Sequence, residues 1–463
     1  MKAKPILPKK GLVVSVTVSR ILHAGYIFEN ENVKIAFDPI FENPFSRNCY
    51  AFPPIKFDTA LIKTLKFDAV FISHYHDDHC SLESLNLLDR RTPIYVYCVH
   101  AELFSLIREL GFAQVFPLKL NSTTEVGPFK ITTHPALDRD VDSIFQIRTA
   151  GLNILNVVDS WIDPETFNTL KENSPWNLIL WPFQTMRELE VLSPSRNRGT
   201  APEWPSEWID QLKLLKPQWI VPSSCQFLQE DWSWYNQFYF PISYRFFEQL
   251  MQTVLPETKA IRMNPGTRFL LETQKMDSTQ PLGWIHPIGN QNVDYVFDAD
   301  LVAPSAADIA KQFKAISSEQ EKLVRDYCQS GLLTHYKSFD ASESEYFSRP
   351  RFWRLSIFNE HGVATDIHFK AGGGQMELIQ KIDDKDLEWT TEISINKFYS
   401  GLHDGESLSS MYVRINDRPF NLKVESELKM VDVLEDPLLR CLFNTNVMSF
   451  QRAQLKKIKN QPV

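Results

Sequence analysis

The 463-residue sequence contains no uninterrupted apolar run long enough to cross a membrane. Its basic N-terminus, residues 1–10, lacks the apolar core that a signal peptide requires. No broad basic stripe is visible and the formal net charge is −8, which argues against a nucleic-acid-binding surface. We therefore expect a cytoplasmic protein that acts without a nucleic-acid or membrane partner.

Regularly spaced cysteines are also absent, so we expect reduced thiols and no disulfide framework. Cys98-Val99-His100 is similar to the first half of a Rieske iron–sulfur motif, but no Cys-x-x-His follows at a suitable distance, which excludes that cluster. The six cysteines are Cys49, Cys80, Cys98, Cys225, Cys328 and Cys441.

The length exceeds that of a typical single domain, and the hydrophobic share of 43% is that of an ordinary globular protein. Polar residues replace apolar ones over residues 274–280. The sequence therefore predicts a larger domain over residues 1–275 and a smaller C-terminal α+β domain over residues 276–463. We expect the smaller domain either to cover the functional edge of the larger one as a lid or to form a homodimer contact.

The most specific pattern is the loop His74-Tyr75-His76-Asp77-Asp78-His79, which follows the apolar run Ala69–Ile72. Leu82, Leu85 and Leu88 then recur at helical spacing, so the loop joins a buried strand to a helix. Two imidazoles separated by one residue can reach one metal ion, and the following Asp-His pair can turn toward a second. The loop therefore predicts a site for two metal ions.

Strands alternate with helices on either side of this loop, which predicts an α/β layered fold. A turn at residues 29–32 is expected to join strands at 12–18 and 33–37, and Gly372-Gly373-Gly374 lacks the context of a phosphate loop and is expected to be a turn. Further strands are predicted at 94–97, 114–118, 129–133, 144–148, 153–158, 178–183, 218–221, 268–271, 352–358 and 409–415, and helices at 102–110, 207–215 and 308–330.

Asp38, His134 and Asp159 each stand at the end of a predicted strand. Asp38 either orients a ligand histidine or is satisfied by backbone amides. A lone strand-end histidine is more often structural, but the first metal still lacks a third imidazole, so we assign His134 as a ligand. Asp159 stands where a carboxylate could bridge two metals. The predicted ligand set is His74, His76, Asp78, His79, His134 and Asp159.

The order of these ligands, each placed after a strand, resembles the metallo-β-lactamase superfamily. The resemblance implies an α/β fold, an αββα sandwich with the metals at one edge of two sheets. In hydrolytic members a last histidine follows a late strand. Here that position reads Pro222-Ser223-Ser224-Cys225, without a histidine.

A closer resemblance is to the metallo-β-lactamase-like portion of CMP-N-acetylneuraminate hydroxylase, carried by Ile72–His79, His134-Pro135-x-x-Asp138, Leu155–Asp159 and Pro265-Gly266-Thr267. That family also lacks the last histidine, but it carries a Rieske domain that this chain does not have. In length and layout the chain is also similar to stand-alone diiron monooxygenases with a metallo-β-lactamase fold.

Two enzymatic interpretations follow, and a metal-free scaffold is disfavoured because all six ligand candidates are present. A diiron oxygenase would hydroxylate a small-molecule or conjugated metabolite with O₂, and a separate ferredoxin or reductase would supply electrons. A dizinc hydrolase would cleave an ester, amide or phosphoester with an activated water that Asp78, the predicted catalytic residue, orients or deprotonates. We favour the oxygenase, because the resemblance over nearly the whole chain is to a hydroxylase that shares the missing histidine, and its loss would leave an open position on the second metal.

Two classes of substrate are compatible with the sequence. An anionic group could be received by arginines on segments near the metal edge, whereas tryptophans could favour a bulky apolar molecule. The arginines are Arg139, Arg148, Arg187, Arg196 and Arg198, and the tryptophans are Trp181, Trp204, Trp232 and Trp234.

Overall fold

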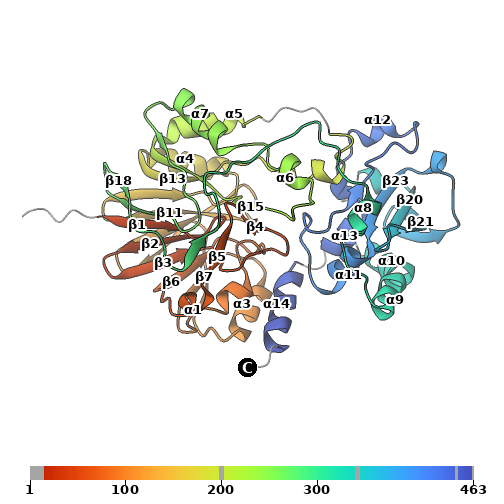
Figure 1. The fold of residues 1–463 in the computed structure, drawn as a ribbon, viewed down its shortest axis with the longest axis horizontal. Helices are drawn as coiled ribbons and strands as arrows, with labels where there is room; N and C mark the ends of the chain where they lie inside the picture. The colour runs from red at the N-terminus through yellow and green to blue at the C-terminus, as the bar shows by residue number, and fades with distance from the viewer. Residues whose placement is uncertain (1–14, 198–202, 339–344, 444–446, 461–463) are drawn as a thin grey trace, which may run out of the picture.

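A computed structural model describes residues 15–197, 203–338, 345–443 and 447–460 (Figure 1). The first part of the chain forms two facing β-sheets with helices outside them, and the later part forms a separate body beside this sandwich. Residues 12–14 of the first predicted strand, and Arg198, lie outside the described residues.

The first sheet contains eight strands in the order β18-β17-β1-β2-β3-β6-β7-β8. Neighbours are antiparallel from β18 to β3 and parallel from β3 to β8. The bounds are β1 Val16–Arg20, β2 Tyr26–Asn30, β3 Val33–Phe37, β6 Ala69–Ile72, β7 Ile94–Val96, β8 Val115–Pro117, β17 Arg268–Leu271 and β18 Met276–Ser278.

The second sheet contains seven strands in the order β16-β14-β13-β12-β11-β10-β9. Here β9 to β12 are antiparallel and β12 to β16 are parallel. The bounds are β9 Ser122–Val126, β10 Phe129–Pro135, β11 Ser143–Thr149, β12 Leu152–Asn156, β13 Trp176–Pro182, β14 Pro217–Ser223 and β16 Lys259–Ala260; the paired short strands are β4 Tyr50–Ala51 with β15 Phe227–Leu228, and β5 Ile55–Phe57 with β19 Ile285–Pro287.

Buried aromatic side chains fill the space between the two sheets. Phe37 of β3 lies 5.1 Å from Phe71 of β6 and 5.0 Å from Phe145 of β11, ring centroid to centroid. Each side chain is fully buried, and such rings contribute large apolar area to a core. Helices flank both outer faces, which confirms the predicted αββα sandwich (Figure 1). These helices are α1 Thr59–Ile62, α2 Leu82–Leu85, α3 Ala101–Glu109, α4 Pro164–Glu172, α5 Ser206–Leu215, α6 Tyr235–Phe238 and α7 Tyr244–Val254.

The C-terminal body contains a five-stranded sheet in the order β22-β21-β20-β23-β24, with its own buried core. This agrees with the predicted smaller α+β domain. The strands are β20 Arg351–Phe358, β21 Ala364–Gly372, β22 Gln375–Ile379, β23 Trp389–Ser394 and β24 Arg414–Ile415, and the helices are α8 Ala306–Ala310, α9 Ser318–Asp326, α10 Leu332–Tyr336, α11 Ile395–His403, α12 Glu425–Leu428, α13 Pro437–Phe443 and α14 Ser449–Asn460.

Three local predictions need correction and a fourth is confirmed. The strand predicted at 409–415 is limited to β24, Arg414–Ile415. A strand, β2, lies between the two runs that the sequence joined by a single turn, and the turn at residues 31 and 32 joins β2 to β3. The helix predicted over residues 308–330 is divided into α8, α9 and a π-helical turn at Tyr327–Gly331. The triple glycine does form a turn, in which Gly373 and Gly374 have φ of 56° and 71°, values that glycine adopts without strain.

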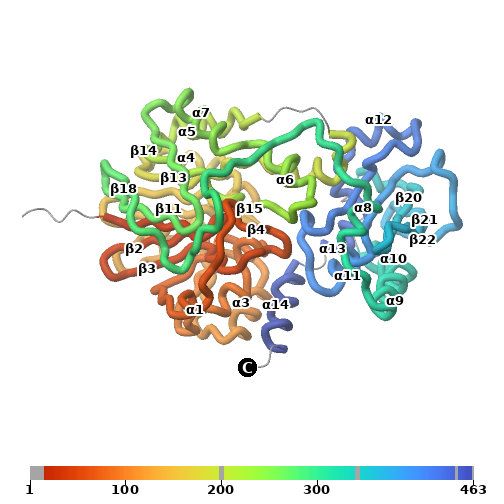
Figure 2. Tube along the Cα trace, in the orientation of Figure 1, coloured from red at the N-terminus to blue at the C-terminus, as the bar shows by residue number. Residues whose placement is uncertain are grey.

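The two bodies are tied together at several points. Residues 279–305 run from the sandwich to the second body, and α14 returns to lie against α2 and α3 of the sandwich (Figure 2). The division after residue 275 stays a prediction, and β18 and β19, which follow it, pair with strands of the sandwich.

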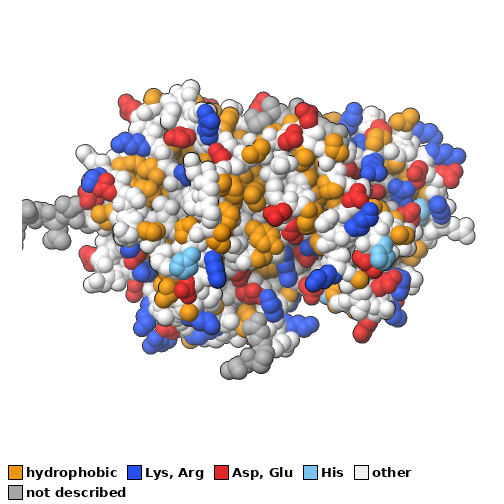
Figure 3. Space-filling view, viewed as in Figure 1, with side chains coloured by type: hydrophobic (Ala, Val, Ile, Leu, Met, Phe, Trp, Pro, Cys, Tyr) orange, Lys and Arg blue, Asp and Glu red, His pale blue; other side chains and the backbone are white. Residues whose placement is uncertain are grey.

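The described residues contain no helix that is both long and apolar enough to cross a membrane. Basic and acidic side chains are interspersed over the face shown in Figure 3, in agreement with the lack of a basic stripe in the sequence.

Candidate metal centre

Loops at one edge of the two sheets bring seven metal-ligating side chains together. His23 lies in the turn between β1 and β2, and residues 74–79 follow β6. Asp142 lies between β10 and β11, and Asp159 follows β12. Each strand ends at this edge, so residues far apart in the sequence become neighbours.

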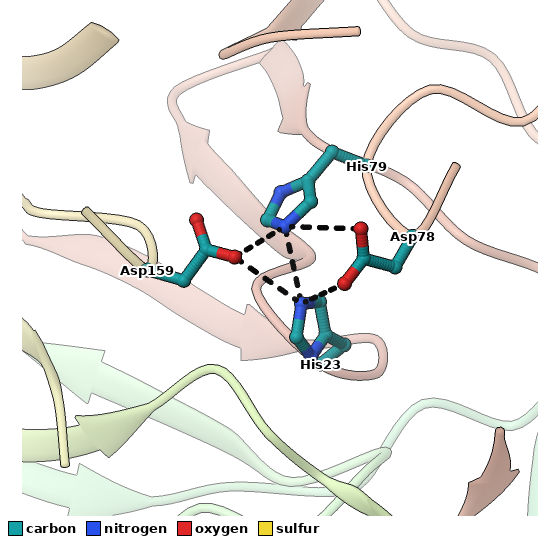
Figure 4. A group of neighbouring side chains, drawn as sticks. All are labelled: His23, Asp78, His79 and Asp159. Carbon is teal, nitrogen blue, oxygen red and sulfur yellow. Dashed lines mark hydrogen bonds and ion pairs between the residues drawn. The ribbon is translucent and has the colours of Figure 1, made fainter. Parts of the chain in front are cut away.

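The first group contains His23, Asp78, His79 and Asp159, each with one ligand atom within 4.8 Å of the others (Figure 4). His79 Nε2 lies 2.9 Å from Asp159 Oδ2. His23 Nε2 lies 3.2 Å from Asp78 Oδ2 and 3.1 Å from His79 Nε2. Both histidines are almost completely buried, so their nitrogens are directed at these neighbours and not at bulk solvent.

The second group contains His74, His76 and Asp142. His74 Nε2 lies 3.0 Å from His76 Nδ1 and 3.7 Å from Asp142 Oδ1. The two groups adjoin, because the His74 and His79 ring centroids are 4.1 Å apart. Two imidazoles and one carboxylate form a donor set that iron and zinc both accept.

Asp38 orients one histidine of each group. Its Oδ2 accepts a hydrogen bond from His79 Nδ1 at 3.2 Å and one from the Ser73 hydroxyl at 2.7 Å. Because that hydroxyl donates to Asp38, its oxygen accepts from His74 Nδ1 at 2.8 Å. Both rings therefore hold a proton on Nδ1 and direct Nε2 into the centre, the arrangement that metal-ligating histidines use. These contacts support the orienting role. The other sequence alternative also holds in part, because Asp38 Oδ1 accepts a hydrogen bond from the Ser73 backbone N–H at 2.8 Å.

His23 has the opposite arrangement. The backbone N–H of Cys225 donates to His23 Nδ1 at 2.9 Å, so in the neutral ring Nε2 carries the proton. That proton is directed toward Asp78. In this tautomer His23 is a hydrogen-bond donor to Asp78, and ligation through Nε2 requires loss of the proton.

The charges of the first group favour a cation among its carboxylates. In the adjoining second group, burial lowers the pKa of His74 to about 4. Burial also acts to lower the pKa of His79, but the Asp159 and Asp78 carboxylates outweigh it and hold that pKa well above the usual value. Desolvation would raise the pKa of Asp159, yet the adjacent His79 holds it below its usual value. A metal ion would supply the same positive charge, so the donor set fits one.

Several non-glycine residues in and beside the centre have a left-handed backbone. His23, Asp38 and Val158 have φ of 53°, 41° and 65°, and Ser224 and Cys225 have φ of 59° and 47°. Left-handed backbone is costly for non-glycine residues, above all for β-branched valine. Such outliers persist where surrounding structure fixes them, and they gather at functional sites.

Five of the six predicted ligands fall in these two groups: His74, His76, Asp78, His79 and Asp159. His134 falls in neither. Its Nε2 lies 3.4 Å from the Gln146 side-chain amide, and its buried Nδ1 has no hydrogen-bond partner among the described residues. Ligation by His134 therefore stays a prediction.

The sequence interpretation did not assign two members of the centre, His23 and Asp142. The available signal for His23 was its place directly after the first predicted strand, and Asp142 had no distinctive motif. Near the late strand, Cys225 lies in neither group, and its sulfur is 3.3 Å from Met186 Sδ. The imidazole nearest to that strand end is His23.

A pocket of about 370 Å³ opens beside the two groups. The sandwich and the C-terminal body both line it, the latter through residues 406–409 and through Phe443, Val447, Ser449, Phe450 and Gln451. Its wall includes Tyr75, His76, Asp77, Asp78, Asp159, Met186, Glu188, Phe227, Tyr239, Phe450 and Gln451.

Of the side chains proposed for substrate contact, the four described arginines and the four tryptophans do not line this pocket. Arg139 pairs with Asp163 at 2.8 Å, Arg196 pairs with Glu425 at 2.7 Å, and the Arg187 guanidinium lies over Phe238. None of the four tryptophans lines the pocket.

Residues 17–172 match the family model described as Beta-lactamase superfamily domain. Together with the two-sheet sandwich, this match defines a metallo-β-lactamase fold that carries a candidate binuclear metal centre at the expected edge. A C-terminal domain is added to that fold. No curated protein matches the chain significantly.

Several solved structures are similar to the chain at low identity. The novel metallo hydrolase Igni18 from Ignicoccus hospitalis is 19% identical over 56% of this chain and 99% of its own, with a TM-score of 0.39. The diiron beta-hydroxylase CmlA from Streptomyces venezuelae is 16% identical over 56% of this chain and 54% of its own, with a TM-score of 0.38. The isothiocyanate hydrolase from Delia radicum gut bacteria is 14% identical over 55% and 99%, with a TM-score of 0.40.

Proposed function

We propose that the protein is a diiron oxygenase that hydroxylates a small molecule with O₂ and electrons from an external ferredoxin or reductase. The observation that supports this is the group of His74, His76 and Asp142 next to a second, carboxylate-rich group. Two histidines and one carboxylate with open positions are typical of non-haem iron oxygenases. We propose the cytoplasm as its location.

In this proposal His74, His76 and Asp142 hold one ion, and Asp78, His79 and Asp159 hold the other. Bound iron would supply the redox chemistry that activates dioxygen. The protein would fix the imidazoles through Asp38 and Ser73, so that their Nε2 atoms are oriented before metal binds. His134, with its unpartnered Nδ1, remains the third imidazole predicted for the first ion.

The pocket walls would exclude water and position the substrate. His76 is accessible from the pocket, whereas His74 and His79 are only 1% exposed. A substrate in the pocket would therefore meet the centre on the side of His76, Asp78 and Asp159. Coverage by the C-terminal body is consistent with the proposed lid role of that domain.

A dizinc hydrolase is the second candidate, and His23 is the observation that favours it. His23 brings a second imidazole to Asp78, His79 and Asp159, the group for which the late strand supplies no histidine. In that case Asp78 would orient or deprotonate the attacking water. The bond from Cys225 to His23 Nδ1 weighs against this, because it leaves the proton on Nε2.

Metal analysis of protein purified without added metal tests the proposal. We expect about two iron ions per chain, a visible charge-transfer band, and O₂ consumption with a ferredoxin and its reductase. Zinc in place of iron, with no O₂ consumption by the iron-reconstituted protein, would contradict the oxygenase and support the hydrolase. Protein that binds neither metal would remove both candidates.

A further inference from the structure

The pocket beside the metal centre contains carboxylates but neither of the permanently cationic side chains. Among its described lining residues there is no lysine and no arginine. Three of its carboxylates lie outside the two metal groups: Asp77, Glu188 and Glu406. The charge environment of these three differs, and that difference indicates what the pocket can bind.

Two of the three carboxylates have a cation of the protein nearby. Glu406 lies 3.3 Å from the ammonium of Lys397. Asp77 is influenced by the positive charge of Arg47. Arg47 lies over the Phe450 ring, 4.9 Å from its centroid, and does not itself line the pocket.

Glu188 has no such cation among the described residues. Its carboxylate accepts a hydrogen bond from the Tyr239 hydroxyl at 3.1 Å. The charged groups that act on it most strongly are Asp78, Asp159 and Glu190, all negative; the first two belong to the metal group, whose ion would offset their charge. The side chain is accessible through the pocket, yet the protein surrounds it closely enough that desolvation raises its pKa to about 7. An ammonium group in the pocket can form a charge-assisted hydrogen bond with this carboxylate.

Gln451 of α14 supplies a second, independent observation. It lines the pocket but is only 1% exposed. Its Nε2 donates to the backbone oxygens of Tyr75 at 2.7 Å and Cys80 at 3.2 Å, which fixes the orientation of the amide. Its buried Oε1 accepts no hydrogen bond among the described residues. A buried acceptor without a donor is costly, and a ligand N–H would satisfy it.

Apolar side chains form the remaining walls. Phe227, Phe443 and Phe450 line the pocket with Leu408 and Val447. A ligand that fits these walls has a hydrocarbon or aromatic body, with N–H groups at its polar end.

We propose that this pocket binds a small molecule with an apolar body and an ammonium group, which Glu188 and Gln451 receive, and that it selects against anionic molecules. The inference rests on the proposed function, since it treats the pocket as the substrate site of that enzyme. It replaces the anionic substrate that the arginines had indicated with a cationic one.

The test compares two probes of equal shape, 4-phenylbutylammonium and 4-phenylbutan-1-ol, on the full-length metal-loaded protein by calorimetry. We expect the ammonium to bind at least about tenfold more tightly than the alcohol, as a charge-assisted hydrogen bond provides. Glu188→Gln should reduce this preference to about twofold or less, because the amide retains the shape but not the charge. Glu190→Gln, which changes a nearby carboxylate outside the pocket, should keep the full preference.

Equal binding of the two probes, or a preference that survives Glu188→Gln, would overturn the inference. So would loss of metal from Glu188→Gln, which would make Glu188 a ligand of the centre. O₂ consumption is measured on the same samples. Ammonium selectivity without O₂ consumption would contradict the oxygenase and leave the cation site supported.

Discussion

Asp38 and His79 form a buried pair, with His79 Nδ1 3.2 Å from Asp38 Oδ2. Through Ser73 the same carboxylate also fixes His74. Asp38 belongs to neither metal group. It nevertheless sets the tautomer of one imidazole in each group, His79 in the first and His74 in the second.

Replacement of Asp38 by Asn should weaken metal binding at both positions. The amide can present an N–H where His79 Nδ1 and Ser73 now donate, so both rings lose their fixed orientation. We expect metal affinity to fall about 10–100-fold, the usual effect of losing such an orienting group, measured by competition with a chelator. Asp68→Asn, at a carboxylate that accepts from the Lys34 backbone N–H, is the control and should bind metal as the wild type does. Unchanged affinity in Asp38→Asn would contradict the orienting role.

His76→Ala and His134→Ala should each remove metal and activity together, if both imidazoles are ligands as predicted. Metal content of the purified variants measures this directly. Full occupancy in His134→Ala would remove that residue from the ligand set and leave its Nδ1 unexplained. The His76 variant is the positive control, since it reports the metal loss expected when a ligand is removed.

Asp142→Asn tests the carboxylate that the sequence did not identify. Its buried Oδ1 has no hydrogen-bond partner in the part of the chain that the structure describes and lies 3.7 Å from His74 Nε2, so a metal ion is the partner that fits it. We expect loss of about one metal ion per chain, by elemental analysis. Asp138→Asn, in the same loop and exposed, should retain both ions.

His23→Gln tests whether His23 donates a hydrogen bond to Asp78 or binds a metal ion. A glutamine amide can still donate to Asp78, so the tautomer argument predicts that metal content is retained, with at most about a tenfold loss of affinity. Stoichiometric loss of one ion would instead identify His23 as a ligand and strengthen the hydrolase candidate. Cys225→Ser should retain both ions, since the contact to His23 is made by the backbone N–H.

Gln454→Ala should destabilise the protein through α14. The Gln454 side chain accepts from the Leu82 backbone N–H at 2.7 Å and donates to the Ser81 hydroxyl at 2.9 Å. Its loss leaves buried groups unpaired, at about 1–3 kcal/mol of unfolding free energy in a denaturant titration. Lys456→Ala, at an exposed position of the same helix, should change stability by less than about 0.5 kcal/mol. Equal effects of the two variants would show that the Gln454 hydrogen bonds do not stabilise the protein.

Local patterns predicted much of the fold and part of the centre. The loop from His74 to His79 was identifiable because its ligands are adjacent in sequence and follow a buried strand. Asp38 and Asp159 were identifiable because each ends a strand at the same edge. The sandwich followed from these strands once the resemblance supplied its topology.

His23 and Asp142 could not be predicted in the same way. Each stands alone in its loop, and its position depends on pairing between distant segments. His23 and Cys225, for example, are separated by 202 residues. The Glu188 environment could not be predicted for the same reason, since Tyr239 contacts Glu188 only in the folded chain. Periodicity and spacing report local structure, whereas these contacts depend on tertiary packing.

The bond between Gln451 and Tyr75 joins residues 376 positions apart. During synthesis the ligand loop therefore leaves the ribosome long before the helix that secures it. Contacts of such high sequence separation form late and slowly in folding. Until α14 docks, the loop would lack this contact. We therefore expect metal incorporation to follow completion of the chain. A truncated product should be metal-poor even with every ligand present.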